Sequence, residues 1–368
     1  MDLEALKSSA EARPLVERIE SLVTSPVSLM EVCGTHTVAI SRFGLRSLLP
    51  ERLRLLSGPG CPVCVTPVVE IDRSIKAART DGVILTTFGD MMRVPGSAST
   101  LEREKAEGAD VRILYSALES LDIAAENPGS EVVFVGVGFE TTSPTVAATV
   151  LEAERRGVTN FSVLPFFKTV PGALDLLASV PGRPLDGFIC PGHVSTIIGS
   201  DAYMPVARDH NLPCVVVGFE ALDILAGIVM LLKQVQGIRD RGERARVETQ
   251  YSRAVTPGGN RAAAELLARV FEPCDAEWRG IGTIDGSGYR FAAGFRSYDA
   301  RERIELTVEP SPPATGCICG EIMLGAKLPP DCALFGSRCT PRDPVGPCMV
   351  STEGSCAAFY KYERGEQA

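Results

Sequence analysis

The sequence has little that would direct the protein to nucleic acid, to a membrane or into a secretory route. Its net charge is −9, with acidic and basic residues mixed along the chain, so no basic surface for polyanions is expected. The N-terminal stretch MDLEALKSSAEARPLVERIE lacks a basic segment followed by an apolar one, so no signal peptide is expected. The longest apolar run, Leu222 to Leu232, is well short of the roughly 20 residues of a membrane span. We therefore expect a cytoplasmic protein with no nucleic-acid and no membrane partner.

Two common catalytic motifs are also missing. The sequence has no Gly-x-Ser-x-Gly nucleophile elbow, so Ser-His-Asp catalysis has no support. It has no Gly-x-x-x-x-Gly-Lys-Ser/Thr loop for phosphates either.

Cysteine, in contrast, is abundant. The chain has twelve cysteines, and because a cytoplasmic protein cannot rely on structural disulfides, clustered cysteines indicate metal or redox chemistry. The early ones are Cys33, Cys61 and Cys64. Six crowd the last segment: Cys317, Cys319, Cys332, Cys339, Cys348 and Cys356. The isolated ones, expected to be buried and inert, are Cys190, Cys214 and Cys274.

Between about residues 25 and 240, short β-branched runs alternate with longer helical patterns. This alternation predicts an α/β fold with parallel sheets that are covered on both faces. The expected strands are Val27–Val32, Leu53–Leu56, Gly82–Phe88, Val111–Tyr115, Glu131–Phe139, Phe161–Phe166, Gly187–Cys190 and Cys214–Phe219. The expected helices include Pro67–Thr80, Ser143–Arg156 and Ala221–Val235.

Two sequence echoes indicate two similar α/β domains. DGVI (81–84) resembles DGFI (186–189), and VGFE occurs at both 137–140 and 217–220. Because the spacing between the echoes differs in the two halves, one half would hold an insertion. The expected α/β domains are residues 25–130, with the early cysteines, and residues 131–240.

The texture changes after residue 240. A helix at Asn260–Phe271 should precede a hairpin that turns at DGSG (285–288), and EPSPP (309–313) reads as a linker. The expected third domain is residues 241–368, joined by an N-terminal helix at 1–24, and it would carry an iron–sulfur cluster.

Unusual loops follow five of the predicted strands: CGTH (33–36), GPGCPVC (58–64), FGD (88–90), GFETT (138–142) and CPGH (190–193). Because ligands bind beyond the carboxyl ends of parallel strands, these loops should surround one cleft. Asp90, Glu140 and His193 are therefore candidates for contact with a cofactor. The simpler alternative for Glu140 and for Glu220 is an acid in the first turn of a helix.

Cys33 is the sharpest single candidate. It ends a strand where a helix begins, and a helix N-terminus and an imidazolium at His36 would both stabilise a thiolate, the form that binds metal. His36 could instead be a second ligand or a proton donor. Cys61 and Cys64 form a C-x-x-C pair in a rigid Gly-Pro frame, which suits a dithiol/disulfide couple.

The six cysteines of the tail exceed the four thiolates that a [4Fe–4S] cluster needs. Zinc has the same ligand count in a Cys₄ site, and the spacings match neither the usual ferredoxin runs nor paired zinc knuckles. The pattern alone therefore predicts a metal site and favours iron–sulfur only modestly.

Long blocks of the sequence resemble the HypD family of hydrogenase maturation proteins over almost the whole chain. They are MEVCGTHT (30–37), GPGCPVCVTP (58–67), TFGDMMRVPGS (87–97), VGFETTSPT (137–145), CPGHVSTIIG (190–199) and the tail CGEI…DCALFG…CTP…GPCMVSTEGSC. The resemblance implies a scaffold that assembles the Fe(CN)2CO unit of [NiFe]-hydrogenases with the chaperone HypC. Cyanide would come from HypE, which would receive its carbamoyl group from HypF.

The resemblance also assigns roles to the cysteines. Cys33 would hold iron jointly with a cysteine of HypC, Cys61 and Cys64 would act as a thiol relay, and a [4Fe–4S] cluster in the tail would pass electrons to them. The expected cluster ligands are Cys317, Cys332, Cys339 and Cys356. Cys319 and Cys348 would form an extra redox pair, although Cys317 and Cys319 are about equal candidates for the ligand.

Such a protein would be a redox-active assembly scaffold rather than a classical turnover enzyme. Two alternatives remain open at the level of sequence. One is a stand-alone iron–sulfur oxidoreductase that acts on a small molecule in the same cleft. The other is a zinc-stabilised binding module.

Overall fold

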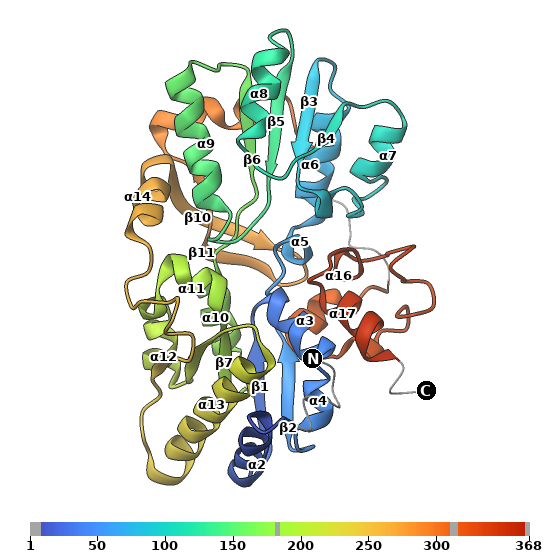
Figure 1. Ribbon diagram of the computed structural model, residues 1–368. Coiled ribbons are helices and arrows are strands. Elements are labelled where there is room, and N and C mark those ends of the chain that lie inside the picture. The colour runs from blue at the N-terminus through green and yellow to red at the C-terminus, as the bar shows by residue number, and fades with distance from the viewer. Residues whose placement is uncertain (1–8, 181–184, 310–315, 365–368) are drawn as a thin grey trace.

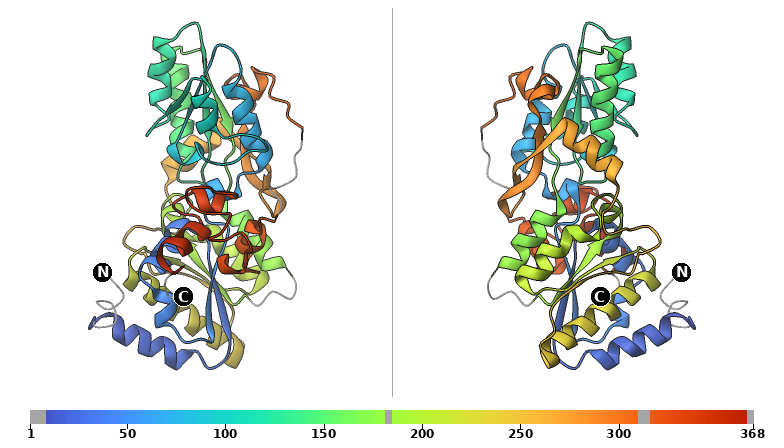
Figure 2. Two further views of the ribbon diagram at one scale, coloured as in Figure 1. Left: turned by 90° about the vertical axis from the view of Figure 1, so that its right-hand side faces the viewer. Right: turned by 90° about the vertical axis from the view of Figure 1, so that its left-hand side faces the viewer.

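The computed structural model describes residues 9–180, 185–309 and 316–364, and it has an α/β fold built around two parallel sheets (Figure 1). Sheet A lies in the lower half of Figure 1 and sheet B in the upper half, with an antiparallel hairpin between them. Figure 2 shows the C-terminal tail, in red, at the waist between the two sheets. The predicted α/β class with parallel sheets is confirmed.

Sheet A has five parallel strands in the order β2-β1-β7-β8-β9. The bounds are β1 Val27–Glu31, β2 Leu53–Ser57, β7 Gly187–Pro191, β8 Cys214–Val217 and β9 Val247–Thr249. Neighbouring residues of one strand enter different cores, as Val215 and Val216 do, so both faces of the sheet are covered.

Sheet B has four parallel strands in the order β4-β3-β5-β6. The bounds are β3 Val83–Thr87, β4 Val111–Ile113, β5 Glu131–Gly136 and β6 Phe161–Pro165. All eight expected strands are therefore present, each ending within three residues of its predicted limit. β9 was missed because its sequence, VET, is short and has a single apolar residue.

The partition of strands between the sheets differs from the expected domains. The boundary at residue 130 falls inside sheet B, where β3 pairs with β5. β1 and β2, expected to share a domain with β3, instead pair with β7 and with each other in sheet A. Sheet B is thus a continuous segment, inserted between the two stretches of chain that build sheet A.

The two sequence echoes fall at corresponding places in the two sheets. The DGVI and DGFI echoes begin β3 and β7, and the VGFE echoes follow β5 and β8. β3 pairs with β5 and β7 pairs with β8, both in parallel. The spacing differs because β4 lies between β3 and β5 of sheet B, whereas no strand lies between β7 and β8 of sheet A.

Helices on both faces complete the two units. Around sheet A they are α2 (Ala12–Leu22), α3 (Gly34–Arg42), α4 (Leu45–Leu48), α10 (Val170–Ser179), α11 (Gly192–Ile198), α12 (Met204–His210) and α13 (Ala221–Arg241). Around sheet B they are α6 (Val68–Ala78), α7 (Leu101–Ala106), α8 (Glu119–Glu126), α9 (Ser143–Arg156) and α14 (Arg261–Val270). Short 3₁₀ turns are η1 (Gly89–Met91), η2 (Ser200–Tyr203), η3 (Ala293–Tyr298) and η4 (Ala300–Glu302).

The N-terminal helix does not join the cysteine-rich segment as expected. α2 packs on α13 and shares a core with β1 and β2, so it belongs to sheet A, while residues 1–8 lie outside the described part. α13 is long and apolar enough to cross a membrane by length and composition alone. About two thirds of its apolar window is buried inside the protein, where it serves as a core helix of sheet A.

The segment after residue 240 contributes elements to both sheet units and does not form a domain of its own. β9 extends sheet A, and α14 packs against α9 of the sheet B unit. The expected hairpin exists as β10 (Phe271–Trp278) and β11 (Gly282–Phe291), but its turn lies between Trp278 and Gly282. The DGSG sequence lies within β11 instead, beside an irregularity opposite Cys274 and Ala276. Most of the expected linker, 310–313, lies outside the described residues.

The tail carries only short elements: α15 (Cys319–Met323), η5 (Pro329–Asp331), α16 (Pro347–Val350) and α17 (Ser355–Tyr362). α17 packs against α3, and α16 packs against α5 (Pro62–Val65), the helix of the C-x-x-C pair. The cysteine-rich tail is therefore attached to the two early cysteine motifs.

Candidate metal centre

Cys33 lies where β1 ends and α3 begins, and a buried carboxylate fixes the main chain there. The Cys33 N–H donates to Glu31 Oε2 at 3.0 Å, and the Thr37 hydroxyl donates to Glu31 Oε1 at 2.5 Å. Burial raises the pKa of the Cys33 thiol to about 12, although the N–H groups of His36 and Thr35 act in the opposite direction. The prediction that Cys33 is an activated thiolate is therefore wrong for the protein without metal, in which the thiol is protonated. A bound cation would have to displace the thiol proton.

His36 is neutral rather than an imidazolium. Its ring is buried, and Nε2 lies 2.8 Å from the carbonyl oxygen of Gly218, so Nε2 carries the proton and donates. Burial lowers the pKa of His36 to about 4, which corrects the expectation of a cation beside Cys33. Nδ1 is buried and has no hydrogen-bond partner among the described residues. It remains a lone-pair donor of the kind that metals bind.

An aromatic stack joins two of the predicted loops, CGTH and CPGH, through Phe219 at the carboxyl end of sheet A. The Phe219 ring stacks on His36 at 5.0 Å between centroids and on His193 at 3.9 Å. His36 follows β1, His193 follows β7 and Phe219 follows β8, so adjacent parallel strands deliver all three. This part of the predicted convergence of loops is confirmed.

The C-x-x-C loop lies directly against Cys33. Gly34 N–H donates to the Gly60 carbonyl at 2.9 Å, and a Cβ atom on Gly60 would overlap the main-chain nitrogen of Cys33. Only glycine permits this approach. Cys61 and Cys64, which open and occupy α5, form a disulfide, and the Cys64 N–H donates to the Cys61 sulfur at 3.2 Å. The two cysteines are therefore bonded to each other, and their role as a dithiol/disulfide couple stays a prediction.

Glu353 of the tail completes the surroundings of Cys33 and was missed from the sequence. The Thr35 hydroxyl donates to Glu353 Oε1 at 2.7 Å, and the Gly34 backbone lies so close to Glu353 that a Cβ atom there would clash. Burial raises the pKa of Cys33 and lowers the pKa of His193. The negative charge of Glu353 is a smaller effect that acts to raise the pKa of both groups. Glu353 stands between two cysteines in the block GPCMVSTEGSC, which was the available signal.

The structure brings most tail cysteines into one buried group. Cys317 and Cys319 have their sulfurs 3.2 Å apart, and the thiol of Cys319 raises the pKa of Cys356. The sulfur of Cys339 accepts the Val345 N–H at 3.3 Å. Burial and the neighbouring sulfurs raise the pKa of the thiols that they surround. The members, judged by their mutual charge interactions, are Cys317, Cys319, Cys339, Cys348 and Cys356.

Cys332 is half-buried and is not joined to this group by any described side-chain contact. Within residues 9–180, 185–309 and 316–364, no three or more Cys, His, Asp or Glu side chains are arranged to hold a metal ion. The expected ligand set, which includes Cys332, therefore stays a prediction, as does the iron–sulfur domain.

A buried cation tests whether the thiol group suits a thiolate-bound cluster. Arg279, in the hairpin turn, has a buried Nη1 with no partner among the described residues. Burial lowers the pKa of Arg279, while the sulfurs of Cys319, Cys348 and Cys317 act against this effect. A guanidinium group with an unused N–H beside neutral thiols lacks a counter-ion, whereas thiolates around a metal would supply one. The sulfurs and the unpaired cation therefore have the chemistry that a thiolate-bound cluster of iron–sulfur or of zinc needs, while their arrangement in the described residues does not form a metal site.

Of the remaining candidate residues, Asp90 and Glu140 follow strands of sheet B, and Glu220 follows β8 of sheet A. Asp90, in η1 after β3, is exposed, and no described contact links it to Cys33. Glu140, after β5, is buried, and its Oε1 accepts the Val170 N–H at 2.9 Å. Burial raises the pKa of Glu140 to about 7. Glu220 forms the N-cap of α13 and makes no side-chain cap hydrogen bond.

The sequence was compared with known families and proteins. Residues 10–363 match the family "HypD: Hydrogenase formation hypA family". The chain is 46% identical to a hydrogenase maturation factor HypD of Azotobacter vinelandii over its full length and 98% of that protein. It is 44% identical to the Escherichia coli hydrogenase maturation factor HypD over 93% of this chain and 90% of that protein. A putative hydrogenase expression/formation protein of Methanocaldococcus jannaschii is 43% identical over 97% of both chains. The chain belongs to the HypD family of hydrogenase maturation factors.

Proposed function

We propose that the protein is a cytoplasmic scaffold on which the Fe(CN)2CO unit of a [NiFe]-hydrogenase is assembled, together with a HypC-type chaperone. Iron is the cargo, and Cys33 holds it jointly with a cysteine of the chaperone. HypE delivers cyanide, and HypF supplies HypE with its carbamoyl group. The family membership supports the process, and the surroundings of Cys33 support the role of this residue.

One observation carries the proposal: Cys33 lies where three segments that bear cysteine or histidine meet. The Gly60 carbonyl holds the C-x-x-C loop to α3, and Glu353 holds the tail to the same turn. His36 brings an unprotonated Nδ1 to the N-terminus of that helix. A soft thiolate, a buried setting and adjacent sulfur groups are what low-spin iron with cyanide and CO requires.

The residues of this chain divide the chemistry among them. The Cys33 thiol, neutral when metal is absent, releases its proton as iron binds. The Cys61–Cys64 disulfide takes up two electrons and two protons to become two thiols, and it returns both pairs when it re-forms. When bound, a [4Fe–4S] cluster in the tail would supply electrons singly. Its candidate ligands are Cys317, Cys332, Cys339 and Cys356, with Cys319 and Cys348 as the alternatives that the observed grouping favours.

Infrared spectroscopy of the anaerobically purified complex with the chaperone tests the assignment. The wild-type complex should show cyanide and CO stretching bands, and the Cys33→Ala variant should lose them. Cys274→Ala is the matched control, because Cys274 is a half-buried cysteine of the hairpin, and this variant should keep the bands. Bands of full intensity in Cys33→Ala would contradict the proposal, and turnover of a small substrate without partners would favour an oxidoreductase.

A further inference from the structure

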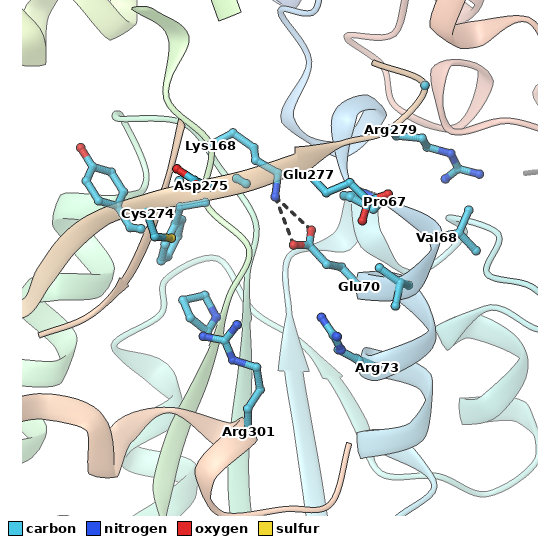
Figure 3. A pocket seen from close by; sticks show the side chains of 17 residues that line it. Pro67, Val68, Glu70, Arg73, Lys168, Cys274, Asp275, Glu277, Arg279 and Arg301 are labelled. Atoms are coloured by element: carbon cyan, nitrogen blue, oxygen red, sulfur yellow. Dashed lines mark hydrogen bonds and ion pairs between the residues drawn. The ribbon is translucent and has the colours of Figure 1, made fainter. Parts of the chain in front are cut away.

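A cavity of about 530 Å³ lies apart from Cys33, between α6, the connection from β6 to α10, and the hairpin (Figure 3). Its volume is in the range of small-molecule sites. One wall is apolar and aromatic, with Pro165, Phe167 and Tyr289. Arg279 borders the cavity, but Figure 3 shows its side chain directed away from the Lys168–Glu70 pair.

Three cationic side chains lie around the half-buried acid of the cavity, Glu70. Lys168 is 1% exposed, and its Nζ lies 3.1 and 3.2 Å from the two carboxylate oxygens of Glu70. Arg73 lies three residues after Glu70 on the same helix, α6, and Arg301 lines the same cavity. Figure 3 shows both guanidinium groups turned toward the space beside the Lys168–Glu70 pair.

The charges inside this cavity do not cancel. Glu70 offsets Lys168, and Asp299 offsets Arg301 with hydrogen bonds of 2.6 to 3.2 Å. Arg73 is half-buried and forms no ion pair with any described residue within 4.0 Å.

Two further acids border the cavity, and neither reaches this excess charge. Asp275 and Glu277 are exposed at its mouth, and Asp275 already accepts the Gly286 N–H at 2.9 Å. The Arg73 guanidinium is therefore left without a counter-charge among the described residues. The neighbouring Arg301 guanidinium bonds Asp299 through Nε and Nη2 and keeps further N–H groups for a ligand.

We propose that this cavity binds a small molecule that carries one oxyanion, a phosphate or a carboxylate, on an apolar body. The oxyanion lies between Arg73 and Arg301, because planar guanidinium forks bind such groups through paired charge-assisted hydrogen bonds. The apolar body lies along Phe167 and Tyr289. Burial raises the pKa of Tyr289 to about 12, so its hydroxyl stays neutral. This site is independent of the scaffold function and contains none of its cysteines.

Isothermal titration calorimetry on the full chain in anion-poor buffer tests the proposal with three probes: phenyl phosphate, benzoate and inorganic phosphate. Phenol is the uncharged comparison. We expect saturable binding of phenyl phosphate or benzoate with one site per chain, and the tighter of the two identifies the oxyanion. Inorganic phosphate should bind more weakly than phenyl phosphate, because it lacks the apolar body. Phenol should bind at least tenfold more weakly than the better anion.

The key variant is Arg73→Gln, which removes the unpaired charge and breaks no ion pair. Its affinity should fall at least tenfold, with an unchanged circular dichroism spectrum. Arg54→Gln is the matched control, since Arg54 is exposed on β2 and forms no ion pair with the described residues. Cys33→Ala should also bind normally, which separates this site from the scaffold function.

Three results would overturn the inference. The first is the absence of saturable binding for all three anions. The second is equal affinity in Arg73→Gln and wild type. The third is binding of phenol as tight as that of the anions, which would indicate an apolar pocket without anion recognition.

Discussion

Replacing Glu140 with glutamine should change how the stability of the protein depends on pH. Glu140 is buried after β5, with one carboxylate oxygen bonded to the Val170 N–H and the other without a partner in the described structure. Burial raises the pKa of Glu140 from 4.5 to about 7. Between these values the folded protein binds a proton that the unfolded chain has released, so stability falls as pH rises.

The size of the effect follows from the two pKa values. At 1.36 kcal/mol per pH unit, a rise from 4.5 to about 7 corresponds to about 3 kcal/mol. Wild type should lose this amount from Glu140 as the pH rises from about 4.5 to about 7, and the loss should level off at higher pH. Glutamine has no charge to bury, and its Oε1 can still accept the Val170 N–H.

Urea unfolding followed by circular dichroism at pH 5, 6, 7 and 8 measures the difference. The free energy of unfolding of Glu140→Gln relative to wild type should increase with pH, by roughly 2–3 kcal/mol over this range. Glu265→Gln, at an exposed position of α14, should show no such trend. A constant difference between Glu140→Gln and wild type across all four pH values would refute the reasoning.

Three further changes test other contacts. Gly60→Ala forces a methyl group onto the Cys33 backbone, so it should cost about 1–3 kcal/mol in urea unfolding, whereas Gly129→Ala, in open space, should cost less than 1 kcal/mol. Trp278→Phe removes the 2.8 Å hydrogen bond to Ser287 and should cost about 1–2 kcal/mol by the same assay; an unchanged midpoint would contradict that role. If the tail holds a cluster, Arg279→Gln should make the midpoint potential of the cluster more negative in an EPR-monitored titration, because the positive charge of Arg279 stabilises the reduced form. Arg279→Lys keeps the charge and should restore the wild-type potential.

The strands could be predicted from the sequence because buried parallel strands are nearly continuous apolar runs, as in β5. Their grouping could not, since periodicity says nothing about which strands pair across a long insertion. The hairpin turn was misplaced because DGSG satisfies the local rule for a turn, while the actual turn, Arg279–Ile281, is set by contacts with Val65 and Gly320.

The sequence predicts which loops meet at the site better than it predicts the protonation states of the residues in them. The order of strands explains why CGTH and CPGH meet, because β1 and β7 are neighbours whose ends share an edge. The protonation states were wrong since burial outweighs the helix terminus at Cys33 and keeps His36 neutral. Glu353 reaches Cys33 only through tertiary packing of α17 on α3, which no local pattern encodes.

The insertion of sheet B into sheet A sets an order for biosynthesis. β3 to β6 emerge from the ribosome in succession and can pair at once, whereas β1 waits with an open edge for β7. The main chain of Ser28 finds its partner, Asp186, 158 residues later. Glu353 arrives later still, 318 residues after its partner Thr35, so a nascent chain lacks one wall of the Cys33 loop until the cysteine-rich tail has emerged. The thiol proposed to hold iron thus acquires its full surroundings only after the tail has been synthesised and has packed against α3.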